Sequence, residues 1–516
     1  MMLSRKIWLF SVCSFFIIIC ISAVYGQQQE VRILHVNDFH GFAVEYRPYG
    51  SSEMQGGLAY LAGKVDKLRS EKPSLLLAAG DMIQGNNWAN LFQGKSVIEA
   101  MNVMGFDAMV VGNHEFDYGQ DVLRERIAEA NFPVLGANVT GVSELKQYVI
   151  KELEGIRVAI IGVVTDEVPV TTHPRNVVGL EFLPPADRVQ KIVWDLRNRC
   201  DIIVVLSHLG FAGDMELAKK VNGIDLIVGG HSHTKLEKPV FVGMTTIVQA
   251  YEHGKALGVV EITVEDRQIA GITSYLEPIH PDPKVMNKTV AAIVDHYQKK
   301  VDASMNETVG FAEVDLDGKY VRFKETNLGN LLADIMRGAS GADTSIINGG
   351  GIRTSINKGP VKVNDVYSVV PFDNYIVAIK LSGKQIQETL EHGVSGIEED
   401  EGRFPQVSGL IFTYDRTAPK GSRVKEILIA GQLLVPEKDY TVATNDFLAA
   451  GGDGYKAFGD ALKSSKDYSV MGGTIKAEKL VYNDSGRWLR DVIIDYIKDQ
   501  KTISPKVEGR IKELRY

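Results

Sequence analysis

The feature that most constrains this chain is a repeated pairing of a short apolar segment with polar residues directly after it. The apolar segments are 31–36, 74–79, 108–111, 202–207 and 226–228. Helix-like apolar spacing, as at 58–68, separates some of them. Strands that alternate with helices indicate a layered α/β structure. Ligand sites of such sheets gather at the carboxyl ends of strands, so the pattern predicts a site along one sheet edge.

The length of 516 residues is too great for one hydrophobic core, and two domains are expected. A stretch rich in proline and charge, 277–284, precedes an apolar helical pattern at 290–301. The second half has strand patterns of its own at 344–347, 376–381, 410–414 and 440–443, and helical patterns at 328–337 and 383–392. We therefore predict a first domain at 27–280, a linker helix at 281–305 and a second domain at 306–516.

The N-terminal segment 1–26 has the features of a secretory signal peptide. Arg5 and Lys6 precede a long apolar run, and a polar run of glutamines follows Gly26. We expect cleavage near Gly26, export to the periplasm or to the extracellular side, and no stable membrane anchor afterwards. An uncleaved anchor helix is the alternative, because the run approaches spanning length. Cys200 would be the one cysteine left, so no internal disulfide is expected.

The net charge and the types of polar residue limit the kinds of ligand that this chain can bind. The net charge of -8 gives no global basic field for a nucleic-acid partner. Carboxylate and imidazole side chains follow the apolar segments, and these ligand types suit zinc, manganese or iron(II). Each position alone has an ordinary explanation, such as a helix cap at Asp81. Together they predict two divalent metals that clamp a phosphoryl group. The polar residues that follow the apolar segments include Asp38, His40, Asp81, Asn113, His208, His231 and His233.

Two motifs carry a resemblance. The segments LHVNDFHG (34–41) and GNHEFDYG (112–119) are similar to the metallophosphoesterase superfamily, and to its 5′-nucleotidase branch in particular. The resemblance implies a four-layer α/β/β/α domain with two divalent metals, most often zinc or manganese. It places Asp38, His40, Asp81 and His233 on the first metal, and Asp81, Asn113, His208 and His231 on the second. It also implies a catalytic dyad of His114 and Asp117.

The second half contains two glycine-containing loops, NGGGIR (348–353) and NDFLAAGGDGY (445–455). Read alone, the first is an ordinary glycine-rich turn with an arginine. Both resemble the C-terminal domain of the same family, an α/β nucleotide-binding domain. The resemblance implies that Phe372 and Phe447 sandwich a base, that Asn348 contacts the base and that Asp453 contacts the ribose. Arg322 and Arg353 would hold ribose or phosphate oxygens.

These expectations describe an exported enzyme that hydrolyses nucleoside 5′-monophosphates to nucleoside and phosphate by means of a metal-bound hydroxide. The same fold also carries UDP-sugar hydrolases, 2′,3′-cyclic-nucleotide phosphodiesterases with 3′-nucleotidase activity, NAD pyrophosphatases and a sulfate-cleaving enzyme. The two phenylalanines argue against the last of these. A binding protein with a decayed site is disfavoured, because every expected ligand and both dyad residues are present. The oligomeric state and the preferred nucleotide stay open.

Overall fold

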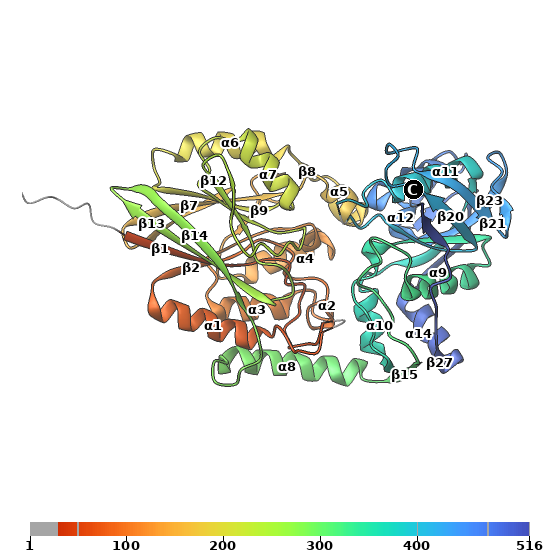
Figure 1. Cartoon of the computed structure of the whole chain (residues 1–516), viewed down its shortest axis with the longest axis horizontal. Coiled ribbons are helices and arrows are strands. Elements are labelled where there is room, and N and C mark those ends of the chain that lie inside the picture. Colours follow the sequence, from red (N-terminus) through yellow and green to blue (C-terminus); the bar gives the residue numbers. More distant parts are fainter. Residues whose placement is uncertain (1–28, 49–50, 400, 472–473, 515–516) are drawn as a thin grey trace, which may run out of the picture.

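The computed structural model describes residues 29–48, 51–399, 401–471 and 474–514. The predicted signal peptide lies outside these ranges. Two units lie side by side (Figure 1), and helix α8 (Lys288–Met305) runs along the base of the first unit and leads into the second. Among the described residues, no helix has the length and apolar character needed to cross a bilayer.

The first unit contains two six-stranded sheets. The first sheet has the order β14 (Gln268–Pro278), β13 (Ala256–Glu265), β1 (Gln29–Val36), β2 (Ser74–Ala78), β3 (Ala108–Val110), β4 (Val134–Leu135). The second has the order β11 (Val240–Val242), β12 (Thr245–Gln249), β10 (Leu226–Gly229), β9 (Ile202–His208), β7 (Ile156–Val164), β6 (Tyr148–Leu153). An apolar core that includes Ile33, Leu77 and Val204 fills the space between them. The inner strands of both sheets are buried on both faces, which explains their continuous apolar runs.

Helices cover the outer faces of both sheets (Figure 1). The first sheet packs on α1 (Leu58–Glu71), α3 (Lys95–Met104) and α8, and the second on α6 (Pro185–Leu196) and α7 (Phe211–Lys220). Helix α6 buries Val189, Ile192, Val193 and Leu196, the spacing of one helical face. The layers are therefore α/β/β/α, and the predicted fold class is confirmed.

The second unit is built on a mixed five-stranded sheet. Its order is β19 (Pro405–Ser408), β16 (Thr344–Asn348), β23 (Asp439–Asn445), β18 (Tyr375–Ser382), β26 (Leu480–Trp488). Its helices are α9 (Asn327–Ser340), α10 (Val363–Val369), α11 (Gly383–Gly393), α12 (Asp446–Ala449), α13 (Lys456–Lys463) and α14 (Leu489–Gln500). Two apolar cores on opposite sides of the sheet hold it together, one against α11 and α13 and the other against α9 and α14.

Parallel strands explain why distant polar residues meet. Strand β1 is parallel to β2, and β2 to β3. In the facing sheet β7, β9, β10 and β12 are also parallel. The carboxyl ends of both sets lie at the end of the sandwich that faces the second unit, as Figure 1 shows. The loops after these strands are therefore brought to one edge.

Candidate active site

The predicted metal ligands occupy unusual backbone at the strand ends. Five of them have positive φ values although none is glycine: Asp38 (48°), His40 (50°), Asp81 (55°), His231 (75°) and His233 (52°). Left-handed backbone costs a non-glycine residue about 1–3 kcal/mol. Such residues collect where surrounding structure enforces a functional geometry, so the edge has the character of a built site.

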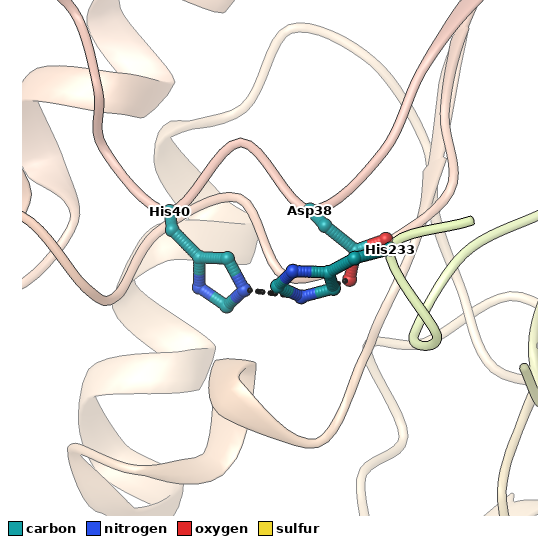
Figure 2. Close-up of side chains that lie close together, drawn as sticks. All are labelled: Asp38, His40 and His233. Carbon is teal, nitrogen blue, oxygen red and sulfur yellow. Dashed lines mark hydrogen bonds and ion pairs between the residues drawn. The ribbon is translucent and has the colours of Figure 1, made fainter. Parts of the chain in front are cut away.

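One cluster joins Asp38, His40 and His233 (Figure 2), whose ligand atoms all lie within 4.8 Å of one another. The Nε2 atoms of His40 and His233 are 3.2 Å apart, and Nε2 of His233 is 3.4 Å from Asp38 Oδ1. Nδ1 of His40 donates to the Gln84 carbonyl, and Nδ1 of His233 donates to the Glu252 carboxylate. When both rings are neutral, each Nε2 atom therefore carries a lone pair, and the two lone pairs face each other. This arrangement fits a bound cation.

A second cluster joins Asp81, His208 and His231. Nδ1 of His208 donates to the Ala79 carbonyl at 2.7 Å, which directs Nε2 toward Asp81 Oδ2 at 3.1 Å. Asn113 Oδ1 is buried beside them and has no hydrogen-bond partner among the described residues. An orphaned buried oxygen is costly unless a ligand satisfies it, so this donor set also fits a divalent metal.

Asp81 lies between the two clusters. Its Oδ2 is 3.8 Å from His40 Nε2 on one side and 3.1 Å from His208 Nε2 on the other. Burial by itself would raise the pKa of Asp81, but the surrounding imidazoles lower it well below its usual value. A permanently ionised carboxylate in this position is suited to bridge two cations.

Glu115 holds two of the ligand-bearing loops in place. Its carboxylate accepts hydrogen bonds from the backbone N–H groups of Asp81, Met82 and Gly112 at 2.9, 2.8 and 2.5 Å. The side chain is 2% exposed. Sequence reasoning assigned no role to Glu115, although its position directly after His114 within GNHEFDYG was the available signal.

His114 and Asp117, the two residues of the predicted dyad, are in contact. Nδ1 of His114 lies 2.6 Å from Asp117 Oδ2, and the backbone N–H of His114 donates to Asp81 Oδ1 at 3.0 Å. Burial acts to lower the pKa of His114, but the Asp117 and Asp81 carboxylates outweigh it and the pKa lies above its usual value. The imidazole can therefore carry a proton beside the metal ligands, which is the requirement for a general acid.

A cleft of about 1320 Å³ separates the two units, and both contribute to its walls. The first unit contributes the dyad and four of the predicted metal ligands, Asp81, Asn113, His231 and His233. The second unit contributes every predicted substrate-binding residue: Arg322, Asn348, Arg353, Phe372, Phe447 and Asp453. Asp38, His40 and His208 lie behind this wall and are buried.

Two of the contacts between the units reach the predicted metal ligands and the dyad. Arg353 Nη2 lies 3.3 Å from His40 Nε2, and the Phe372 ring stacks on His114 with centroids 5.8 Å apart. Burial and the nearby Arg322 lower the pKa of Arg353 to about 10, so the guanidinium stays charged at neutral pH. Positive charge from the second unit thus reaches the metal ligands of the first.

Within the second unit, Asn348 and Asp453 meet. Asn348 Nδ2 donates to Asp453 Oδ2 at 2.6 Å, and Asp453 has a left-handed φ of 50°. His392 Nε2 donates to the Asp453 carbonyl at 2.7 Å and supports this backbone. The two residues form one polar pair on the cleft wall. Their predicted separate roles toward base and ribose stay predictions, as do the roles of the other site residues.

Besides Glu115, sequence reasoning also missed Glu252 and Arg490. Glu252 Oε2 accepts from His233 Nδ1 at 2.6 Å, and Lys255 Nζ donates to Glu252 Oε1 at 2.5 Å. Arg490 donates to the Phe372 carbonyl at 3.2 Å and forms an ion pair with Asp373. No local signal marks either residue, because Glu252 lies 19 residues from His233 and Arg490 lies 118 residues from Phe372.

Two family models match this chain, one over each unit of the fold. The profile described as calcineurin-like phosphoesterase matches residues 31–235, and the one described as 5′-nucleotidase, C-terminal domain, matches residues 308–460. The two matches fall on the two units of the fold. The phosphoesterase family uses divalent metals.

Full-length relatives agree with these matches. The mouse 5′-nucleotidase is 31% identical over 94% of this chain and 90% of its own length. A Bacillus subtilis trifunctional nucleotide phosphoesterase is 33% identical over 94% of this chain, which spans only 35% of that protein. The structure of a 5′-nucleotidase precursor from Thermus thermophilus superposes with a TM-score of 0.84, at 33% identity over 95% of this chain and 100% of the other. The chain therefore belongs to the 5′-nucleotidase family of metallophosphoesterases and is a phosphoric-ester hydrolase.

Proposed function

We propose that this enzyme hydrolyses nucleoside 5′-monophosphates to nucleoside and phosphate. The observation that carries the proposal is the composition of one cleft. Predicted metal ligands and a His–Asp pair form one wall, while two arginines, two phenylalanines and the Asp453 carboxylate form the other. A phosphate and a nucleoside need these two kinds of surface, held at a short distance from each other.

Zinc or manganese are the metals we propose, since imidazole, carboxylate and amide donors suit both. The first would be held by Asp38, His40, Asp81 and His233, and the second by Asp81, Asn113, His208 and His231. When bound, two such cations would polarise the phosphoryl oxygens and acidify the attacking water. The lone pairs that face each other at 3.2 Å and the orphaned Asn113 oxygen support this assignment.

Side chains of the protein would bind the substrate and transfer the proton. Arg353, which lines the cleft and contacts His40, binds phosphate oxygens and neutralises charge that develops in the transition state. His114 donates its proton to the departing ribose oxygen, and Asp117 orients and charges the imidazole. Phe372 and Phe447 stack on the base, while Asn348 and Asp453 hydrogen-bond to base and ribose, and Arg322 binds ribose or phosphate oxygens.

A larger substrate is the second proposal. Ligand pockets usually measure about 300–1000 Å³, and this cleft of about 1320 Å³ extends past the dyad toward the start of α7. The extra space favours a UDP-sugar hydrolase activity, in which a sugar phosphate occupies the far end. A 2′,3′-cyclic-nucleotide phosphodiesterase or 3′-nucleotidase activity would use the same walls without filling this extension.

We further propose domain limits of 27–280, 281–305 and 306–516, with rotation about the linker for product release. The separate apolar cores support these limits, since one joins the first unit to α8 and the other contains residues of the second unit alone. Export to the periplasm or the extracellular side is proposed from the apolar segment of 1–26. Mass spectrometry of the natively expressed protein tests it, since a chain that begins near Met1 would contradict cleavage.

Substrate preference tests the main proposal. The mature chain, loaded with zinc or manganese, is assayed for phosphate release from AMP and from glycerol phosphate, with UDP-glucose and 2′,3′-cyclic AMP in parallel. We expect kcat/KM for AMP to exceed that for glycerol phosphate by at least about a hundredfold, roughly 3 kcal/mol of transition-state discrimination. Near-equal values would contradict the nucleoside-binding roles of the second unit. A faster reaction with UDP-glucose would select the second proposal.

A further inference from the structure

A short segment of the first unit contacts both the dyad and the second unit. Helix α5 (Val168–Thr171) extends toward α12 across the gap between the units (Figure 1). It packs against the turn Gly452–Gly454, which contains Asp453. The two residues that follow, Thr172 and His173, point to different partners. The segment is therefore placed to link the chemistry to the position of the second unit.

Thr172 holds the dyad carboxylate. Its Oγ1 donates to Asp117 Oδ1 at 2.5 Å, while the other carboxylate oxygen faces His114 Nδ1 at 2.6 Å. Asn176 Nδ2 donates to the Asp117 carbonyl at 2.7 Å. Thr172 is 2% exposed. The orientation of Asp117 is thus fixed from two sides by residues of one segment.

His173, the next residue, faces the second unit. Its Nδ1 accepts from the Arg175 backbone N–H at 3.3 Å, so the proton of the neutral ring is on Nε2. Nε2 lies 3.3 Å from Asp446 Oδ2. Asp446 is 2% exposed, and its Oδ1 already accepts from the Tyr375 N–H at 3.1 Å. Oδ2, the oxygen that faces His173, has no hydrogen-bond partner among the described residues.

We propose that Thr172 is a positioning residue for the Asp117–His114 dyad, and that the adjacent His173–Asp446 contact makes this position depend on closure of the second unit. The proposal rests on the proposed function, since the dyad roles do. Asp446 directly precedes Phe447, so a base stacked on Phe447 and the contact to His173 use the same turn. Closure around a nucleoside would then complete the support of Asp117, and an open cleft would release it.

The fraction of protein with the cleft closed tests the proposed effect of the His173–Asp446 contact without a measurement of catalysis. Spin labels on the two units report the interdomain distance in metal-loaded protein, with and without adenosine. We expect His173→Ala and Asp446→Asn each to lower the ratio of closed to open protein about tenfold, because each variant removes the close contact between an imidazole and a buried carboxylate. The double variant should be no more open than either single one. The control is His296→Ala, an exposed histidine on α8, which should change nothing. Unchanged distances, or effects that add in the double variant, would overturn the link.

The hydroxyl is tested by kinetics. Thr172→Val removes the donor and keeps the shape, so kcat for AMP should fall at least tenfold with KM nearly unchanged, and Thr172→Ser should restore kcat to within threefold. Full activity in Thr172→Val would refute the positioning role.

If the wild-type enzyme shows no preference for AMP, the proposed function fails. The closure measurement still decides the His173–Asp446 contact, because that contact is present without a substrate.

Discussion

The carboxylate behind His233 offers the sharpest test of the metal site. Glu252 accepts from His233 Nδ1 at 2.6 Å and is itself paired with Lys255. Burial acts to raise the pKa of Glu252, but the neighbouring imidazoles and the Lys255 ammonium lower it well below its usual value. The group is therefore an anion that orients the ring and increases its basicity toward a metal.

Glu252→Gln keeps the volume and an acceptor oxygen but removes the charge. A hydrogen bond to a charged group contributes about 1.5–3 kcal/mol and a neutral one about 0.5–1.5 kcal/mol. The loss of about 1–1.5 kcal/mol corresponds to roughly tenfold weaker binding of the first metal, within the 10–100-fold range known for such outer partners. The second metal, whose proposed ligands do not contact Glu252, should bind within twofold of the wild-type affinity.

Competition of the metal-free protein with a chelating dye measures both dissociation constants. The variants His40→Ala and His208→Ala, each lacking one ligand of one site, identify which constant belongs to which site. Glu237→Gln is the matched control, because its side chain is 73% exposed and pairs only with Lys235 among the described residues. Equal weakening of both sites, or no change at either, would refute the reasoning.

Three further predictions concern the dyad, the base site and a buried acid. Asp117→Asn should lower kcat for AMP by about 10²–10⁴-fold, the usual contribution of proton transfer, and a loss under tenfold in steady-state assays would contradict the dyad. Arg490→Met removes a charged donor to the Phe372 loop and should raise KM for AMP by about tenfold or more, with the kcat for glycerol phosphate as the comparison. Burial raises the pKa of Asp214 to about 7, above an unfolded value near 3.9. Between these pH values the folded state keeps a proton that the unfolded state has lost, so stability falls as pH rises, by up to about 1.4 kcal/mol per pH unit. Asp214→Asn should give a flatter curve in urea unfolding at pH 5, 6 and 7, and parallel curves would contradict the shift.

Much of the first unit could be predicted because its information is local. Continuous apolar runs specify strands buried on both faces, and polar residues directly after them mark strand ends. The expected strands at 31–36, 74–79 and 202–207 are confirmed as β1, β2 and β9. Since parallel strands bring their carboxyl ends to one edge of a sheet, the sequence by itself is enough to group Asp38 with Asp81. The expectation of a single sheet edge was wrong for His208, which ends β9 of the second sheet and joins them only because the two sheets pack face to face.

The tertiary structure alone decided which side chains support that group. Glu252 lies 19 residues from His233, and Arg490 lies 118 residues from Phe372, with no shared periodicity to connect them. Thr172 contacts Asp117 across 55 residues, and His173 contacts Asp446 of the second unit. The spacing of apolar residues in a sequence indicates which face of a helix or strand is buried, because that spacing involves residues only a few positions apart. Partners across loops and domains depend on chain packing, which fixes distances that no local spacing encodes.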